Sequence, residues 1–217
     1  MHIPGGDSEA TKRIVYYLHQ TYKHIRVFIP HMAMSGGTII ARAADEIYMG
    51  PYSSLGPTDP QIFLAGKFIP VQAIINEFDM AFDEVSKNPR RALLWNERLK
   101  QIPFGQIKAA RTMMENSLKY LVELLQKRNC QNKSLGDIKK IANFLNSHEK
   151  YSSRGEGITL DDIKDKLTAK DLSKDKDLKD AMLSIYHSTI IFFERTIAQK
   201  IVINNHKRRY INNYSPR

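Results

Sequence analysis

The sequence predicts an α/β fold whose second half is rich in helix. In residues 1–88, short β-branched or aromatic runs of strand length alternate with stretches of helical periodicity, the pattern of parallel βα units. In residues 89–217 the apolar residues recur at helical spacing. The chain has 217 residues, 42% of them apolar, which is enough for one large domain. We expect an α/β core in 1–88 and a helical portion in 89–217 that completes the same domain.

The elements of the first segment follow from local composition. Asp and Ser cap helices, β-branched and aromatic runs favour strands, and proline suits the first turn of a helix. The expected order is a helix from Asp7 or Ser8 to about Tyr22, a strand at 26–30, a helix at 35–45, a strand at 46–49, a Pro/Gly-rich loop at 53–61, a hairpin at 62–69 around Ala65-Gly66, and a helix from Pro70 to about Lys87.

In the second segment, helical spacing predicts further helices. Thr159 is followed three residues later by Asp162, the pattern of a capping box. The expected elements are helices at 107–127 and 135–145, a polar Gly-rich loop at 151–157, a helix that begins after Thr159, and a long helix at 183–203. The methionine and leucine stripe of the first of these helices is expected to lie in the core.

A candidate nucleophile lies in the turn after the strand at 26–30. The string Ser35-Gly36-Gly37-Thr38 ends this strand and precedes a helical stretch. A serine at a sharp strand-to-helix turn has an accessible hydroxyl beside the free N–H groups and positive dipole end of the helix. The same string is typical of a plain βα loop with a capping serine. The spacing alone leaves both interpretations open.

Two consecutive glycines, Gly5 and Gly6, stand where a strand should end and the first helix should begin. An acyl-transfer site needs a second backbone N–H near the nucleophile to hold the oxyanion. The segments around Gly6 and Ser35 could together supply both parts.

The stretch from Ile3 to Ile62 resembles the serine dehydrogenase proteinase family. This family belongs to the Clp/crotonase superfamily, with signal peptide peptidase A and the Clp proteolytic subunit. The matching strings are Pro4-Gly5-Gly6, residues 33–38, 43–47, 49–50 and 54–61, and in the tail 157–159, 183–187 and 200–204. The most family-specific string is Leu55-Gly56-Pro57-Thr58-Asp59-Pro60-Gln61. On these strings the resemblance covers most of the chain.

The resemblance implies a Clp/crotonase-like core of repeated ββα units and the activity of a serine endopeptidase. Ser35 matches the family nucleophile, and the N–H groups of Gly6 and Gly36 match the oxyanion hole. A protein or peptide would be the substrate, no metal or cofactor would be needed, and relatives form rings or other multimers, which implies a homo-oligomer.

The resemblance does not identify one residue of this chain as the general base. Clp subunits have a histidine near the position of Asp59, so a Ser-His-Asp triad is not evident. In the signal peptide peptidase branch the base is a lysine several tens of residues after the serine, which makes Lys87 and Lys100 the candidates. A lysine base needs a pKa lowered by burial. Lys87 lies at a predicted helix end, where a solvated lysine is the usual case.

Two other functions stay open at this stage. The missing base favours a catalytically inactive or acyl-CoA-type member of the same fold, since the same oxyanion hole serves a thioester. A binding module that uses the basic C-terminal tail is the second alternative. The histidines show no metal-ligand spacing. His31 could lie near Ser35, although a strand-end histidine near solvent is commoner, and His148 resembles a family position of unknown role.

Charge is spread unevenly along the chain. Residues 1–86 hold 6 Lys and Arg against 9 Asp and Glu, whereas 87–217 hold 27 against 14, for a net charge of +10. Most charges of the second segment alternate in sign, as solvated helix faces do. Only Lys207-Arg208-Arg209 forms a concentrated basic patch, so the sequence makes nucleic-acid binding an unlikely function.

The single cysteine, Cys130, excludes an internal disulfide, and a reducing compartment fits. No run of about 18 apolar residues or signal peptide is visible. The chain begins almost directly at Pro4-Gly5-Gly6, where the family has a full apolar strand, so an N-terminal strand is expected to be missing. We expect a cytoplasmic protein, or membrane association in a full-length form through a segment absent here.

Overall fold

The centre of the fold is a parallel sheet whose third strand comes from far along the chain. The computed structural model describes residues 1–64, 66–146 and 157–214. The sheet has the order β1 (Arg26–Ile29), β3 (Glu46–Met49), β7 (Ala169–Asp171). Along β1 and β3 every second side chain is buried, as expected for strands with one face on a core. The chain is thus a mixed α/β protein, as the sequence predicts.

A second layer of short extended segments lies beside this sheet. β2 (Met32–Ala33) pairs in parallel with β4 (Ser54–Leu55). Ile3 extends the layer on the β2 side and Ile158 on the β4 side, through single bridges to Ala33 and Leu55. The residues just before Gly5 and Gly6 are therefore fixed against the strand that leads to Ser35.

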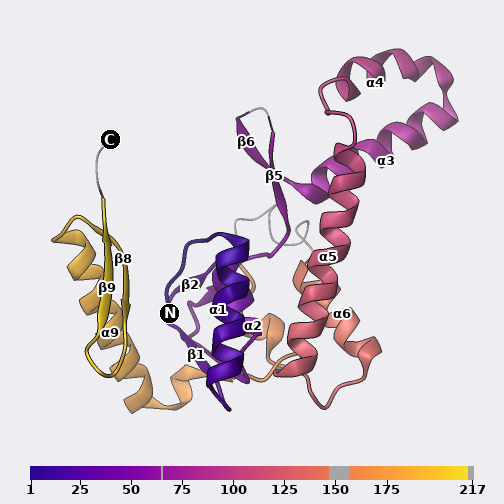
Figure 1. The fold of residues 1–217 in the computed structure, drawn as a ribbon. Coiled ribbons are helices and arrows are strands. Elements are labelled where there is room, and N and C mark those ends of the chain that lie inside the picture. The colour runs from indigo at the N-terminus through magenta and orange to yellow at the C-terminus, as the bar shows by residue number, and fades with distance from the viewer. Residues whose placement is uncertain (65, 147–156, 215–217) are drawn as a thin grey trace.

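Four helices pack around the two layers (Figure 1). They are α1 (Ser8–Thr21), α2 (Gly36–Arg42), α5 (Gln106–Lys127) and α6 (Leu135–Asn146). Asp7 caps α1, because its side chain accepts a hydrogen bond from the N–H of Ala10. The main core joins both segments of the chain, since Leu125 and Leu145 pack in the same buried cluster as Ile29 and Ile47.

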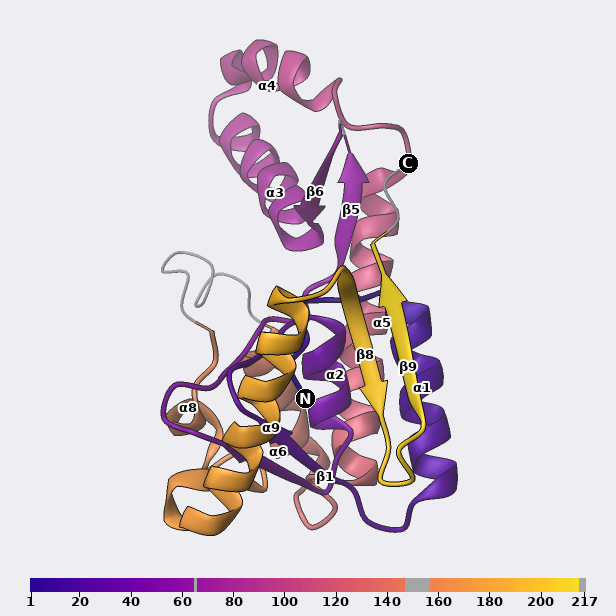
Figure 2. The same ribbon diagram turned by 90° about the vertical axis from the view of Figure 1, so that its left-hand side faces the viewer.

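An arm projects from this body in two perpendicular views (Figure 1 and Figure 2). It contains the antiparallel hairpin of β5 (Gln61–Leu64) and β6 (Lys67–Pro70), then α3 (Val71–Lys87), the short 3-10 helix η1 (Pro89–Arg91) and α4 (Ala92–Leu99). A small cluster of Val71, Ile74 and Ala110 joins the base of the arm to α5. The predicted hairpin is confirmed, and Ala65 of its turn lies outside the described residues.

The C-terminal part begins with α8 (Leu160–Ile163), whose predicted capping box between Thr159 and Asp162 is confirmed. After β7 and the 3-10 helix η2 (Leu172–Lys174) come α9 (Lys176–Glu194), β8 (Ala198–Ile203) and β9 (Arg209–Asn213). The strands β8 and β9 form a separate two-stranded antiparallel sheet.

The prediction of one long helix over 183–203 is wrong. The helix ends at Glu194, and β8 follows. The run Ile201-Val202-Ile203 is β-branched and pairs with β9, so sheet formation outweighs the apolar periodicity that suggested a helix. Among the described residues, no helix is both long and apolar enough to cross a membrane.

Candidate active site

Ser35 lies at the junction of β2 and α2 in a backbone conformation that side chains rarely adopt. Its φ is 49° and its ψ is −112°, and its side chain is exposed. A non-glycine residue in such a region costs about 1–3 kcal/mol, and these residues cluster at functional sites. A sharp strand-to-helix turn of this kind holds the nucleophile out from the backbone in serine hydrolases of the α/β-hydrolase fold.

The hydroxyl of Ser35 is not used as a helix cap. Ser35 stands at the N-cap position of α2 but makes no side-chain capping bond. The first turn is closed by backbone bonds instead, from the N–H of Gly37 to the carbonyl of Met34 (2.9 Å) and from Ile39 to Ser35 (3.1 Å). Ser35 thus occupies the N-cap position, as the capping interpretation expects, but its hydroxyl makes no hydrogen bond within the described part of the chain.

The two glycine segments singled out in the sequence lie side by side. Ile3 donates its N–H to the carbonyl of Met32 (3.1 Å) and accepts from Met34 (2.8 Å), which positions the following residues beside β2. A β-carbon built on Gly36 would lie 3.7 Å from the carbonyl oxygen of Gly6. The start of α2 and the Gly6 loop are thus direct neighbours, next to Ser35.

Close packing requires glycine at positions 36 and 37. A β-carbon on Gly36 would come within 2.4 Å of the Thr11 hydroxyl oxygen, and one on Gly37 within 2.8 Å of the Ile3 β-carbon. Contacts this short are not tolerated without a shift of the neighbour. Because Gly36 and Gly37 have no side chains, α1 and the Ile3 segment can pack directly against the start of α2.

Thr38 fixes the first turn of α2 to the strands below it. Its hydroxyl donates to the carbonyl of Ala33 (2.5 Å) and accepts from the N–H of Gly56 (3.1 Å), and the side chain is fully buried. Sequence reasoning missed this role. A β-branched hydroxyl residue at the core-facing start of an apolar helix was the available signal.

Arg42, also missed in the sequence, is fully buried at the end of α2. Its guanidinium donates to the Thr58 hydroxyl (2.6 Å) and to the carbonyl of Leu145 (3.0 Å). Thr58 belongs to the most family-specific string, and Leu145 to α6. Arg42 thus holds the 53–61 loop against the helical portion, and a lone cation in an apolar helix was the signal.

The two candidate lysine bases lie on the projecting arm. Lys87 is the last residue of α3 and Lys100 directly follows α4, and both are exposed. Lys100 pairs with Glu97 at 2.6 Å. The arm that carries them projects away from α1 and α2 (Figure 1). The role of either lysine stays a prediction.

Two of the histidines, His2 and His31, form an aromatic cluster with Tyr186. His2 stacks on His31 with ring centroids 5.5 Å apart, and Tyr186 of α9 lies 5.5 Å from His2. Burial lowers the pKa of His2, and the nearby charges of His31 and the N-terminal amine act in the same direction. No group of three His, Cys, Asp or Glu suited to a metal occurs in the described residues, and His148 lies outside them.

The segment that contains Ser35 and the Gly6 loop is similar to known sequences. Residues 1–88 match the family of ClpP-like SDH-type serine proteinases. The resemblance of the first segment is thereby confirmed, whereas the resemblance of the tail stays a prediction. The match covers the segment that carries Gly6 and Ser35, which is less than half of the chain.

Two curated relatives match over the same part of the chain. Both are uncharacterized proteins of Methanocaldococcus jannaschii. MJ1495 is 41% identical over 86 residues, or 40% of this chain and 28% of the relative, and MJ0137 is 48% identical over 62 residues, or 29% and 22%. The match thus spans about a quarter of the length of these relatives. No solved structure matches the chain.

Proposed function

We propose that the protein is a serine endopeptidase with a Clp/crotonase-like core and that Ser35 is its nucleophile. The observation that carries the proposal is the backbone of Ser35, strained at φ 49° while its hydroxyl caps no helix. Strain without a structural bond to maintain is typical of a residue held for chemistry. The family of residues 1–88 supports the same conclusion.

In this proposal, the Oγ of Ser35 attacks the carbonyl carbon of a peptide bond and its proton passes to a base. The N–H groups of Gly6 and Gly36 hold the oxyanion. Neither donates to a backbone carbonyl of the described residues, so both are available. The amine then leaves with the proton, and water hydrolyses the acyl-enzyme. No step requires a metal or an organic cofactor.

The base is proposed to be a lysine of the arm, Lys87 or Lys100, supplied by a second copy of the chain. The arm carries both lysines away from the Ser35 of its own chain (Figure 2). An element that projects from one subunit is suited to complete a site on another, so the enzyme would act as a homo-oligomer.

A specific observation favours one alternative. No described side chain forms a hydrogen bond with the Ser35 hydroxyl, so no base is in place among the described residues of the single chain. An inactive or acyl-CoA-type member of the same fold would need none. This alternative predicts that Ser35→Ala changes no turnover and that a thioester binds without hydrolysis.

The test is cleavage of casein, with Ser35→Ala and Ser86→Ala compared to the unmodified chain. Ser86 is an exposed serine of α3 and serves as the matched control. Loss of cleavage in Ser35→Ala alone supports the proposal. A fluorophosphonate probe, which reacts with activated serines, should label the parent and the Ser86 variant only. Equal cleavage or equal labelling in all three would overturn it.

A further inference from the structure

The C-terminal ribbon of β8 and β9 is strongly basic and carries no acid. From Arg195 to Tyr214 the chain has five Lys and Arg and no Asp or Glu. They are Arg195, Lys200, Lys207, Arg208 and Arg209. Such a surface attracts polyanions, because no carboxylate in the same segment reduces its positive potential.

These five cations form no ion pair with any carboxylate of the described residues. Some lysines outside the ribbon do form ion pairs: Lys164 pairs with Asp161 and Lys170 with Glu46, each at 2.8 Å. The mixture of signs that the sequence shows across the second segment therefore does not extend to the ribbon. Its cations are available to an external anion.

The turn of the ribbon is ordered by Asn204. Its side-chain oxygen accepts from the N–H groups of His206 (3.1 Å) and Arg208 (3.0 Å), and its backbone N–H donates to the carbonyl of Arg208 (3.0 Å). Lys207 takes φ 60° at the tip. The turn therefore presents Lys207 and Arg208 at a fixed place.

One face of the ribbon combines two rings, one cation and an amide. Val202 lies opposite Tyr210, and Lys200 opposite Asn212, so these four side chains share one face, which Tyr214 extends. Tyr210 and Tyr214 are 60% and 56% exposed. On the other face, Ile201 and Ile211 oppose each other and are half-buried. The open face is thus the one that bears Lys200 and the tyrosines.

We propose that this ribbon binds single-stranded nucleic acid. The phosphates would contact Lys200 and the turn residues Lys207 and Arg208, and two bases would stack on Tyr210 and Tyr214. Exposed aromatic rings on a strand surface beside cations are how sheet-based domains hold single strands. The binding is independent of Ser35 and goes beyond the peptidase proposed above.

Two other polyanionic partners fit less well. A bilayer surface is bound by a continuous apolar face, whereas here Lys200 and Asn212 separate Val202 from Tyr214. An acidic polypeptide would satisfy the cations but would leave the two exposed rings without a stacking partner. The rings therefore favour nucleobases, and the other two partners become outcomes of the test.

The test measures fluorescence anisotropy of labelled oligo(U) and oligo(dT) of about 12 nucleotides, a length within the usual site size. The full chain is titrated at several salt concentrations between about 50 and 200 mM KCl, where phosphate contacts weaken steeply. We expect binding to both oligomers, since neither rings nor cations read the 2′-hydroxyl, and a preference for one would identify the natural polymer.

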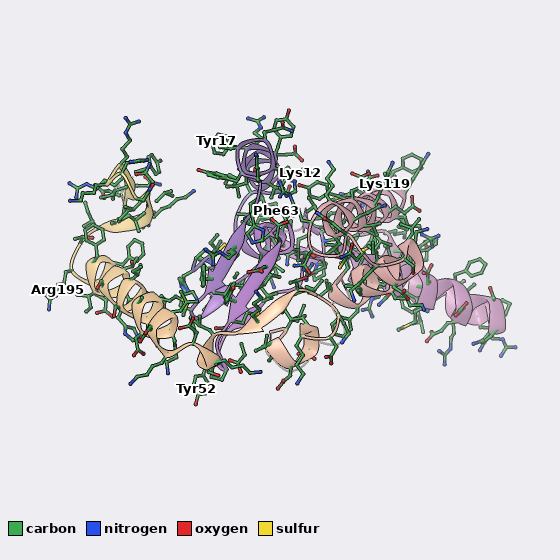
Figure 3. The ribbon with its side chains drawn as sticks, turned by 90° about the horizontal axis from the view of Figure 1, so that it is seen from below. Lys12, Tyr17, Tyr52, Phe63, Lys119 and Arg195 are labelled. Atoms are coloured by element: carbon green, nitrogen blue, oxygen red, sulfur yellow. The ribbon has the colours of Figure 1, made fainter. Side chains whose placement is uncertain are left out.

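The first variant is the triple change Lys207→Asn, Arg208→Gln and Arg209→Gln. Asparagine tolerates the positive φ at position 207 better than alanine does. Affinity should fall at least about tenfold, and the salt slope should drop by about 2, since each phosphate contact contributes about 0.7. The matched control, Lys108→Gln, Lys119→Gln and Lys139→Gln, removes the same charge from exposed helical sites. Figure 3 shows Lys119 on the side of the molecule opposite the ribbon.

The second variant, Tyr210→Leu with Tyr214→Leu, separates stacking from charge. Affinity should fall about tenfold with an unchanged salt slope, and Tyr210→Phe with Tyr214→Phe should restore it. The phenylalanine pair also controls for folding. Several results would overturn the proposal: no binding, equal loss in the lysine control, neutral leucine variants, or tighter binding to polyglutamate, to phosphatidylserine vesicles or to duplex DNA than to single strands.

Discussion

The hydroxyl oxygen of Thr11 lies directly against Gly36. A β-carbon built on residue 36 would come within 2.4 Å of this oxygen. The same hydroxyl donates to the carbonyl of Asp7 at 2.8 Å. Helix α1 is therefore packed on the start of α2 at the point where the proposed oxyanion hole forms.

We expect Gly36→Ala to destabilise the protein by about 2 kcal/mol, the range typical of overpacking. Thr11→Ala should rescue much of this loss, because its remaining β-carbon lies at an ordinary 3.6 Å from the new methyl group. Urea unfolding of both single variants and the double variant measures the coupling. Simple additivity of the two single effects would contradict the contact.

The strained backbone at Ser35 predicts that replacing this residue with glycine stabilises the protein. Ser35→Gly should raise the free energy of unfolding by about 1 kcal/mol, since glycine adopts φ 49° without penalty. The proposed peptidase activity should be lost in the same variant. Ser86→Gly, in the last turn of α3, is the control and should lower stability by about 0.5 kcal/mol or less. A Ser35→Gly variant less stable than the parent would argue against strain.

Thr38 offers a test of the turn that holds Ser35. Thr38→Val keeps the shape but leaves the N–H of Gly56 without the hydroxyl that it contacts at 3.1 Å. Stability should fall by about 1 kcal/mol, since the buried hydroxyl bonds are lost while the N–H of Gly56 keeps its bond to the carbonyl of Ala33 (2.9 Å). Thermal or urea unfolding measures the change. Thr112→Val, at an exposed site of α5, should change stability by less than about 0.5 kcal/mol.

Supply of the base by a second copy can be tested by mixing. Ser35→Ala and Lys87→Ala should each be inactive in casein cleavage. Mixed in equal amounts, they should recover about a quarter of the parent activity, because a quarter of the sites then combine an intact serine with an intact lysine. Lys67→Ala, on β6 of the same arm, is the control and should remain active alone. Recovery with Lys100→Ala but not with Lys87→Ala would reassign the base to Lys100, and recovery with neither would exclude supply by a second copy.

The His2–His31 pair should make stability depend on pH. The pKa of His2 is lowered by burial first and by His31 second, so the folded state disfavours its protonation. The unfolded chain therefore binds more protons, and stability falls as the pH drops below the ordinary histidine pKa of about 6.5. His2→Phe should flatten the melting temperature between about pH 7.5 and about pH 5, whereas His206→Phe at the exposed turn should not. Parallel pH profiles of the parent and His2→Phe would contradict this.

The sequence indicated the part of the site that is local along the chain. Ser35, Gly6 and Gly36 stand in short strings whose turn chemistry is readable, and the structure brings them together. Thr38 and Arg42 were missed because their roles depend on partners such as Gly56 and Leu145, which no local pattern reveals.

The strands β7 and β8 were not predicted from the sequence, for two different reasons. β7 is three residues long and is defined by its pairing with β3, more than a hundred residues earlier. In β8, the apolar periodicity predicted a helix. The segment forms a strand because its β-branched run favours extended backbone and β9 pairs with it. Long-range pairing thus determines what single-sequence patterns leave ambiguous.

The buried guanidinium of Arg42 also sets an order of events during synthesis. Its acceptor on α6, the carbonyl of Leu145, lies 103 residues further along the chain. Until that residue has left the ribosome, the end of α2 lacks one of the acceptors that make burial of a cation tolerable. The final packing of the end of α2 against the 53–61 loop therefore waits until the helical portion of the same polypeptide has docked.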